Sequence, residues 1–491
     1  MLLEIKDQND FEGSRLFVGL SNSTGIALDK LNFMIVYLVS FVLAGFLRTS
    51  LSSDKVSTTT RHIFSIIIGI IFSYFCYGKH AFHLAGFSTL MYTVILTQNP
   101  KFVHIQVFIL SMFYLSCVHL YIQFVISYGT NTLDVTGPLM IMTGKVSSLA
   151  CSLHDGLSRR EEELTPIQKK RLVKEIPRIL DYYSYMFSFI TLMAGPMTFY
   201  DEYKDFIYSR QIQEAQKKIS DKELNSTITF VALKKAICGY LTIIAVYPVL
   251  NVYKIKNLSD NEFMEKSSFL YQLWYMNMYV SIQRLHYYYA WIFADAICNN
   301  AGYGLNGLDE HNQPKMDLLT NINIWKLETA TNMYEYSKYW NYATIRWLRF
   351  VIYDRVSYLK REATYLTSTV WHGFQIGYYI SAFHGTLYVY AEHSFHKHVR
   401  PLLLASEVLK IFYNLLTILI TRIAISFIVI LFQLPYDEDS WINFYRELYF
   451  LHIIVTILSI ILPPILLPIK KEPRFYNVKE NKNENDKNKV E

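Results

Sequence analysis

The chain has 491 residues, of which 52% are hydrophobic and 16% aromatic, and its formal net charge at pH 7 is +6. This charge is modest and concentrated in loops, so nucleic acid is excluded as an expected partner. Apolar runs recur along most of the chain without a Pro/Gly/Ser-rich linker, which excludes a string of soluble domains.

Residues 1–30 are polar and lack the apolar core of a signal peptide, so we expect a polar N-terminal segment. The apolar runs that follow are 33–47, 62–77, 81–97, 102–128, 135–153, 179–200, 229–250, 267–298, 339–353, 363–391, 408–434 and 448–469. They are continuous, whereas a transmembrane β-barrel would show short alternating segments. We therefore predict an all-α, polytopic transmembrane protein in which residues 31–469 form one domain of about 11 membrane helices, each needing about 20 apolar residues.

The charged segments between and after these runs indicate an orientation. Loops 155–178 and 203–218 are rich in Lys and Arg, which favours a position of both loops on the cytosolic side of the membrane. The alternative is that their charges only form ion pairs within a solvated loop and indicate no orientation. Residues 470–491 are rich in Lys, Asn and Glu and are expected to be a disordered, charged cytosolic tail.

Lys487 and Lys489 lie fifth and third from the end, the spacing of a K-x-K-x-x retrieval signal. We therefore predict a multi-pass protein of the endoplasmic reticulum membrane with a cytosolic C-terminus, although chance can produce so short a pattern.

The cysteines do not indicate a metal centre or a disulfide framework. All five are scattered through apolar runs and none belongs to a C-x-x-C pair. Small buried side chains are the simpler interpretation. We expect no metal and no bound cofactor.

Two charged residues stand in one aromatic run, at Arg284 and Asp295. They are 11 residues apart and therefore lie on nearly the same face of a helix, three turns from each other. Charged groups at membrane depth are functional candidates by default. They could orient polar parts of a substrate, or they could be structural groups with satisfied partners near the helix ends.

The strongest chemical pattern is an amide and an imidazole in successive apolar runs. Asn341 follows Trp340, and 31 residues later His372 stands in the triplet Trp371-His372-Gly373. A histidine can deprotonate a hydroxyl directly, and an amide can donate to a developing oxyanion. This pair fits acyl transfer from a thioester to an alcohol. From the pattern alone, a hydrogen-bonded core histidine and a structural asparagine remain alternatives.

At these residues the sequence resembles the membrane-bound O-acyltransferase superfamily. The blocks "YWNYATIRWLRFVIYDR" and "STVWHGFQIGYYISAF" are similar to that superfamily's paired Asn and His blocks. Further blocks resemble its lysophospholipid acyltransferase branch, namely "GKVSSLACSLHDG", "EEELTPIQ", "AGPMTFYDEY", "YYYAWIFADAICNNAGYGLNG" and "NINIWKLETATN". The resemblance runs from about residue 31 to residue 470, nearly the whole membrane part.

The resemblance implies a many-helix fold around a catalytic chamber inside the bilayer. It implies transfer of an acyl chain from acyl-CoA, a substrate, to the free hydroxyl of a lysophospholipid taken from the membrane lipid. His372 would be the general base, and Asn341 would hold the carbonyl or the substrate hydroxyl. Trp371, Trp340, Asp295 and Arg284 are predicted to line the substrate site, and a homodimer stays open.

Two residues of the histidine block differ from the superfamily's pattern. His384 has no counterpart in the superfamily's block, and on a regular helix it would point about 120° away from His372, so we expect a packed or partner-facing residue. The branch often has Pro-Gly-Tyr-Tyr after the histidine, whereas Ile376 stands here in place of the proline. We therefore expect a weaker helix interruption at that point.

Two rival interpretations remain at this stage. A membrane transporter would also bury ionisable groups, but no second copy of either block appears in the first half of the chain. Within the superfamily, the acceptor could instead be a sterol, a diacylglycerol or a protein. The head group and the acyl chain of the substrates are not predicted.

Overall fold

The structure is a computed structural model that describes residues 11–126, 133–246, 249, 252–258, 260–404, 406–434, 444, 446, 448 and 450–467. Within these ranges the ordered elements are helices, and the only β-pairing is an isolated bridge between Leu308 and Pro314. The prediction of an all-α fold is therefore confirmed. The expected tail at 470–491, with Lys487 and Lys489, lies outside the described residues.

The N-terminal half is built from long helices followed by short ones. They are α1 (Val18–Thr24), α2 (Leu28–Thr49), α3 (Thr58–Tyr77), η2 (Gly78–Ala81), α4 (Phe82–Thr97), α5 (Val103–Tyr121), η3 (Ile122–Ile126), α6 (Thr136–Ser158), η4 (Glu161–Glu163), α7 (Pro166–Arg171), α8 (Ile179–Met186), α9 (Tyr200–Ile207) and α10 (Arg210–Gln216).

The C-terminal half contains the longest helix and the two blocks singled out in the sequence. Its elements are α11 (Asp221–Val246), α12 (Ile255–Leu258), α13 (Asn261–Lys266), α14 (Phe269–Asn300), α15 (Ile324–Glu328), α16 (Met333–Tyr339), α17 (Tyr342–Leu348), η5 (Arg349–Tyr353), α18 (Lys360–His372), α19 (Ile376–His398), α20 (Arg400–Leu403), α21 (Glu407–Gln433) and α23 (Leu451–Leu466).

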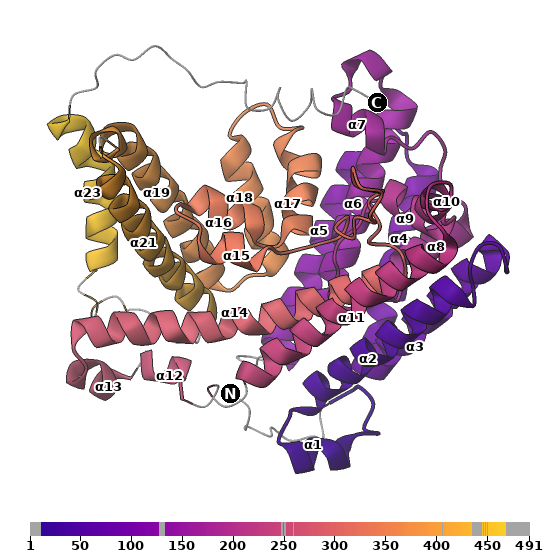
Figure 1. The fold of residues 1–491 in the computed structure, drawn as a ribbon, viewed down its shortest axis with the longest axis horizontal. Coiled ribbons are helices and arrows are strands. Elements are labelled where there is room, and N and C mark those ends of the chain that lie inside the picture. The colour runs from indigo at the N-terminus through magenta and orange to yellow at the C-terminus, as the bar shows by residue number, and fades with distance from the viewer. Residues whose placement is uncertain are drawn as a thin grey trace.

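Helix α14 organises the arrangement of the others (Figure 1). It runs across the molecule beside α11, with which it makes extensive contact. Helices α2 and α3 lie toward one end of the molecule, and α19, α21 and α23 form a group at the other end. The short helices α15 to α18 lie between the two groups and carry Asn341 and His372 (Figure 1).

Five described segments are long and apolar enough to cross a membrane. They are Leu28–Thr49, Thr58–Thr97, Val103–Val125, Asp221–Ala245 and Glu407–Gln433. Large hydrophobic side chains stay exposed on their outer faces, as Val408, Ile411 and Phe412 do on α21. A bilayer would cover such faces. The prediction of a multi-pass membrane protein is confirmed, whereas the number of about 11 spans stays a prediction, as does the chamber.

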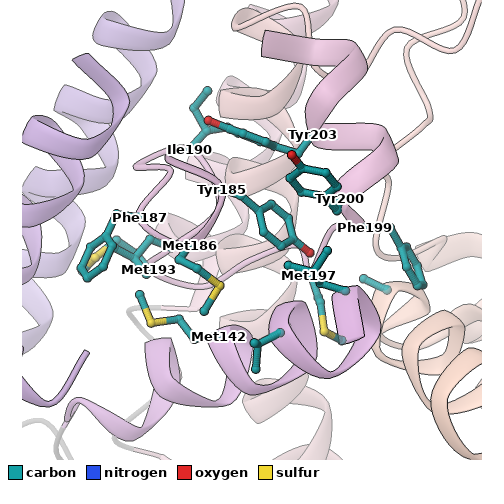
Figure 2. Packing of buried hydrophobic residues seen from close by; sticks show 14 of the residues in the cluster. Met142, Tyr185, Met186, Phe187, Ile190, Met193, Met197, Phe199, Tyr200 and Tyr203 are labelled. Carbon is teal, nitrogen blue, oxygen red and sulfur yellow. The ribbon is translucent and has the colours of Figure 1, made fainter. Parts of the chain in front are cut away.

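The predicted membrane helix at 179–200 is wrong. Helix α8 ends at Met186, and residues 187–199 are turns and irregular chain, including Gly195 at φ +81°. These residues are buried in the interior of the protein, where they pack with Met142 of α6 and Tyr203 of α9 (Figure 2). A run of apolar residues looks the same in sequence whether it faces lipid or fills a protein core.

Candidate active site

Two tryptophans dock the helices of the Asn and His blocks on one common support, helix α6. The indole N–H of Trp347 in α17 donates to the hydroxyl of Ser147 at 2.9 Å. The indole N–H of Trp371 in α18 donates to the carbonyl of Met140 at 3.0 Å. The two rings contact each other with their centroids 5.3 Å apart. The helix that begins after Asn341 and the helix that ends at His372 are therefore held side by side.

Asn341 caps the start of α17 in a left-handed backbone conformation, with φ +51°. Asparagine tolerates this conformation better than most residues. Its side chain is half-buried, and its Oδ1 accepts a hydrogen bond from the Nδ2 of Asn321 at 3.2 Å. Because one end of the amide is bound in this way, the other end, Nδ2, is the end that can donate to a substrate.

His372 is the last residue of α18, and its ring lies among aromatic side chains. The ring centroids of Trp371, Phe432 and Tyr378 are 4.8, 5.3 and 6.2 Å away. The ring makes no hydrogen bond with any residue that the structure describes. A half-buried imidazole in apolar surroundings, with its nitrogens uncommitted, is suited to take a proton from a bound hydroxyl.

The helix break after His372 corrects one expectation. The run 363–391 is not one regular helix, because α18 ends at His372 and α19 begins at Ile376. The chain is interrupted although Ile376 stands in place of the proline, because Gly373 itself ends the helix at φ +121°, a conformation that L side chains rarely adopt. The family-like proline is therefore not needed for the interruption. That the interruption is weaker than with proline stays a prediction.

His119 of α5 lies against this break, and sequence reasoning missed it. Its Nε2 donates to the carbonyl of Trp371 at 3.1 Å, since a carbonyl can only accept. A Cβ on Gly373 would come within 3.3 Å of the Nδ1 of His119. The apolar run 102–128 contains two histidines, His104 and His119, and the partner of His119 could not be predicted from the sequence.

His384 is packed, as expected. It is 4% exposed, and its Nδ1 lies 2.8 Å from the carbonyl of Ile380, one turn earlier in α19. Its ring stands 5.3 Å from that of His452 in α23. His384 thus belongs to the contact between α19 and α23, and the structure places it in a different helix from His372.

Asp295 of α14 is buried and engaged on both carboxylate oxygens. Its Oδ2 pairs with the Nζ of Lys235 in α11 at 2.8 Å and accepts from the hydroxyl of Thr320 at 2.9 Å. Its Oδ1 accepts from the Nδ2 of Asn299 at 3.2 Å. These contacts tie α14 to α11 and to the segment that precedes α15. A role of Asp295 in substrate binding stays a prediction.

Arg284 forms a second ionic centre on α14, away from Asp295. Its guanidinium lies 3.3 Å from Glu328 of α15 and donates to the hydroxyl of Ser281 at 3.0 Å. Arg422 of α21 and the hydroxyl of Tyr288 bind the same Glu328 carboxylate. Arg284 therefore helps join α14, α15 and α21, and its contact with substrate is also a prediction.

Trp340, which precedes Asn341, lies in an aromatic cluster formed by residues of α14 and α16. Its ring centroid is 4.7 Å from Trp291, 5.5 Å from Tyr287 and 6.2 Å from Tyr336. These contacts fix the chain on the N-terminal side of Asn341. Contact of Trp340 or Trp371 with substrate stays a prediction.

A buried ionic network anchors the other side of α17. Glu202 of α9 binds Arg171 of α7 at 3.1 Å and also binds Arg346 of α17. The guanidinium of Arg171 stacks 3.4 Å above the ring of Phe199. Burial alone would raise the pKa of Glu202, but Arg346 and Arg171 outweigh it and lower the pKa below its ordinary value. Among the described residues, no group of three or more His, Cys, Asp or Glu side chains could hold a metal ion.

Comparisons with known proteins show which family the chain resembles. Residues 120–432, which include both blocks, match the profile of the membrane-bound O-acyltransferase family. The chain is 37% identical to lysophospholipid acyltransferase 6 of Drosophila melanogaster over 94% of this chain. That alignment covers only 65% of the Drosophila protein.

Two further relatives are similar over nearly their whole length. Membrane-bound glycerophospholipid O-acyltransferase 2 of Homo sapiens is 33% identical over 96% of this chain and 90% of its own. Membrane-bound glycerophospholipid O-acyltransferase 1 of Mus musculus is 34% identical over 92% of this chain and 93% of its own.

Proposed function

The chain belongs to the membrane-bound O-acyltransferase family, and on this basis we propose that it is a lysophospholipid acyltransferase. It transfers an acyl chain from acyl-CoA to the free hydroxyl of a lysophospholipid, a step of phospholipid remodelling. The names of the relatives support the lipid acceptor. The acyl-CoA donor rests on the resemblance of the Asn and His blocks. Family membership leaves the transporter interpretation without support.

The observation that carries the proposed mechanism is the common docking of α17 and α18 on α6. Through this docking, the helix that follows Asn341 lies beside the helix that ends at His372, whose imidazole makes no hydrogen bond with the described residues. His372 takes the proton of the acceptor hydroxyl as its oxygen attacks the thioester carbonyl. The C–O bond forms, and the carbonyl oxygen becomes an oxyanion to which the Nδ2 of Asn341 donates.

The second half of the reaction returns the proton. The oxyanion collapses, the C–S bond breaks, and the leaving sulfur of coenzyme A takes the proton from His372. The products are a phospholipid and free coenzyme A, and His372 is again neutral. The proposal requires no metal and no bound cofactor, since every electron pair and proton is supplied by the substrates and the two side chains.

The test is an acyl-transfer assay on the full chain in membranes, with a panel of lysophospholipids against a panel of acyl-CoAs. His372→Ala membranes with the same amount of protein are the control. Transfer to at least one lysophospholipid that is lost in the control supports the proposal. Transfer only to a sterol, a diacylglycerol or a peptide would place the chain with another acceptor class of the family.

We further propose that the protein resides in the endoplasmic reticulum membrane with its C-terminus in the cytosol. The support is the Lys-x-Lys spacing of Lys487 and Lys489 and the basic composition of loops 155–178 and 203–218. The cytosolic face of that membrane also provides acyl-CoA. A homodimer stays a prediction.

A further inference from the structure

The side chain of Asn321 is buried between Asn341 and the first turn of α17. It is 5% exposed and stands at the start of "NINIWKLETATN", a block that the proposed mechanism does not otherwise use. Its Oδ1 accepts from the backbone N–H of Ala343 at 2.8 Å. Its Nδ2 donates to the Oδ1 of Asn341 at 3.2 Å. Its own carbonyl accepts from the backbone N–H of Tyr342 at 2.9 Å.

These contacts determine which end of each amide faces which partner. A backbone N–H can only donate, so the atom of Asn321 that faces Ala343 must be the oxygen. The other end of the Asn321 amide is then the nitrogen, which needs an acceptor. Asn341 can accept the hydrogen bond from this nitrogen only if its own side-chain oxygen points toward Asn321. The Nδ2 of Asn341 is thereby directed away from Asn321.

The segment that carries Asn321 is itself fixed by buried groups. The preceding residue, Thr320, donates to the buried carboxylate of Asp295 at 2.9 Å. The carbonyl of Leu318 accepts from the guanidinium of Arg346 in α17 at 3.4 Å. Asn321 is therefore attached to α14 on one side and to α17 on the other, and it has little freedom to reorient its side chain.

We propose that Asn321 is a positioning residue that holds the Asn341 amide with its N–H group toward the reacting carbonyl. The inference rests on the proposed role of Asn341 in acyl transfer. Without Asn321, the Asn341 amide can rotate by half a turn and present its oxygen. An oxygen in that place would repel the developing oxyanion. Asn321 thus sets the polarity of the site without touching the substrate.

The decisive variant is Asn321→Asp, because its hydrogen-bonding capacity depends on pH. An ionised aspartate still accepts from the N–H of Ala343 but cannot donate to Asn341. A protonated aspartic acid can do both, with one oxygen accepting and the hydroxyl donating. The acid form therefore reproduces the hydrogen bonds of asparagine, and the ionised form does not.

The experiment measures kcat and KM of the full chain in membranes between about pH 6 and pH 9, a range in which a buried carboxyl group can titrate. At the alkaline end we expect the kcat of Asn321→Asp to fall about 10- to 100-fold below wild type, as when an oxyanion donor is misplaced. The KM values for both substrates should change much less. The ratio of variant to wild-type kcat should rise as the pH falls.

Asn323→Asp is the matched control. Asn323 lies two residues further on, is exposed and uses only its oxygen, which accepts from the backbone N–H of Lys326 at 3.1 Å. Aspartate caps a helix equally well, so this variant should keep wild-type kcat over the whole pH range. If the ratio of the kcat of Asn321→Asp to the wild-type kcat does not change with pH, whatever its value, the positioning role is overturned.

A second measurement applies if Asn321→Asp does not fold. Asn321→Ala is made in the wild-type chain and in Asn341→Gly. Positioning predicts a loss of kcat of about tenfold in the wild-type chain and little further loss in Asn341→Gly, because coupled residues are not additive. Equal losses in the two backgrounds overturn the inference. An Asn341→Gly enzyme with full activity instead overturns the proposed catalytic role of Asn341 itself.

Discussion

The indole rings of Trp347 and Trp371 lie 5.3 Å apart, and each donates its N–H to helix α6. Trp347 is six residues after Asn341, and Trp371 is immediately before His372. The two proposed reacting groups are thus positioned by one aromatic contact and two hydrogen bonds to a third helix. Reaction rates depend on such placement, since displacement of a reacting group by about 1 Å can cost about a hundredfold in rate.

Removing the imidazole of His372 should abolish turnover. We expect His372→Ala to be inserted and folded, because the ring makes no hydrogen bond with the described residues, and to lose the general base. The measurement is acyl transfer per amount of folded protein. His384→Ala, a variant of the packed histidine in α19, should retain most of its activity. Substantial transfer by well-folded His372→Ala would show that another group is the base.

Replacing Asn341 by glycine should separate its chemical role from its backbone conformation. Glycine adopts φ +51° without strain, so Asn341→Gly should keep the start of α17 while removing the amide. We expect kcat to fall at least about a hundredfold, the cost of losing one oxyanion donor. Thermal unfolding compares it with Asn341→Ala, which carries the additional strain. If Asn341→Gly is as active as wild type, the amide does not act in the reaction.

Substituting Gly373 should displace His372. Gly373→Ala places a side chain at φ +121° and within 3.3 Å of the Nδ1 of His119, so we expect a loss of stability of about 1–3 kcal/mol. The kcat should fall by at least about tenfold through misplacement of the imidazole.

Gly385→Ala is the control for this substitution. Its nearest new contact is the Cδ1 of Ile428 in α21 at 3.8 Å, an ordinary packing distance. It should be close to wild type in unfolding temperature and in kcat. Equal behaviour of the two variants would mean that the break after His372 does not control the position of its ring.

The network around Glu202 should make stability depend on acid. The folded protein holds the pKa of Glu202 below its ordinary value of 4.5, so its contribution to stability is present above that pH and is lost as the pH falls below it. Glu202→Gln should lower the free energy of unfolding at pH 7 by about 3 kcal/mol, because the guanidinium of Arg346 loses its carboxylate partner and that of Arg171 keeps only Asp201.

Thermal unfolding between pH 7 and pH 3 is the measurement, and Glu161→Gln is its control. Glu161 forms an exposed pair with Lys174 at 2.8 Å, and its substitution should leave the free energy of unfolding close to that of wild type. The Glu202→Gln variant should also lose stability less steeply in acid than wild type. A wild-type acid profile in Glu202→Gln would show that Glu202 does not titrate with unfolding.

The residence of the protein should depend on its last residues. Replacing Lys487 and Lys489 by Ser removes the K-x-K-x-x spacing, and we expect a tagged protein to move to later compartments of the secretory route. Immunofluorescence after selective permeabilisation shows in which compartment the protein resides and on which side of the membrane its C-terminal tail lies. An unchanged reticular pattern would mean that the two lysines are not the signal. A tail protected from cytosolic protease would contradict the orientation.

The sequence was sufficient for the helical membrane fold and for the two blocks that carry Asn341 and His372. Apolar runs identify helices that face lipid, because lipid demands hydrophobic side chains along the whole exposed face. The same signal fails for residues 187–199, which are apolar because they fill the interior. It also fails at Gly373, where one glycine in an apolar run gives no indication that it adopts a positive φ.

The partners of the charged residues could not be predicted. Arg284 and Asp295 share a helix, yet their carboxylate and ammonium partners, Glu328 and Lys235, come from different elements 44 and 60 residues away. Pairing at such separations depends on how helices pack. Asn321 is missed for the same reason, since its significance is its contact with Asn341, 20 residues later.

The docking of both tryptophans on α6 has a practical consequence for protein engineering. The tryptophans that accompany the amide and the proposed base are held by Ser147 and Met140, seven residues apart on one helix, and these contacts do not depend on the length of chain between Asn341 and His372. Tyr358, in the turn that joins the two blocks, is 85% exposed. A short epitope or a protease site inserted beside Tyr358 should leave the enzyme active, and cleavage there should yield two fragments that remain associated and functional.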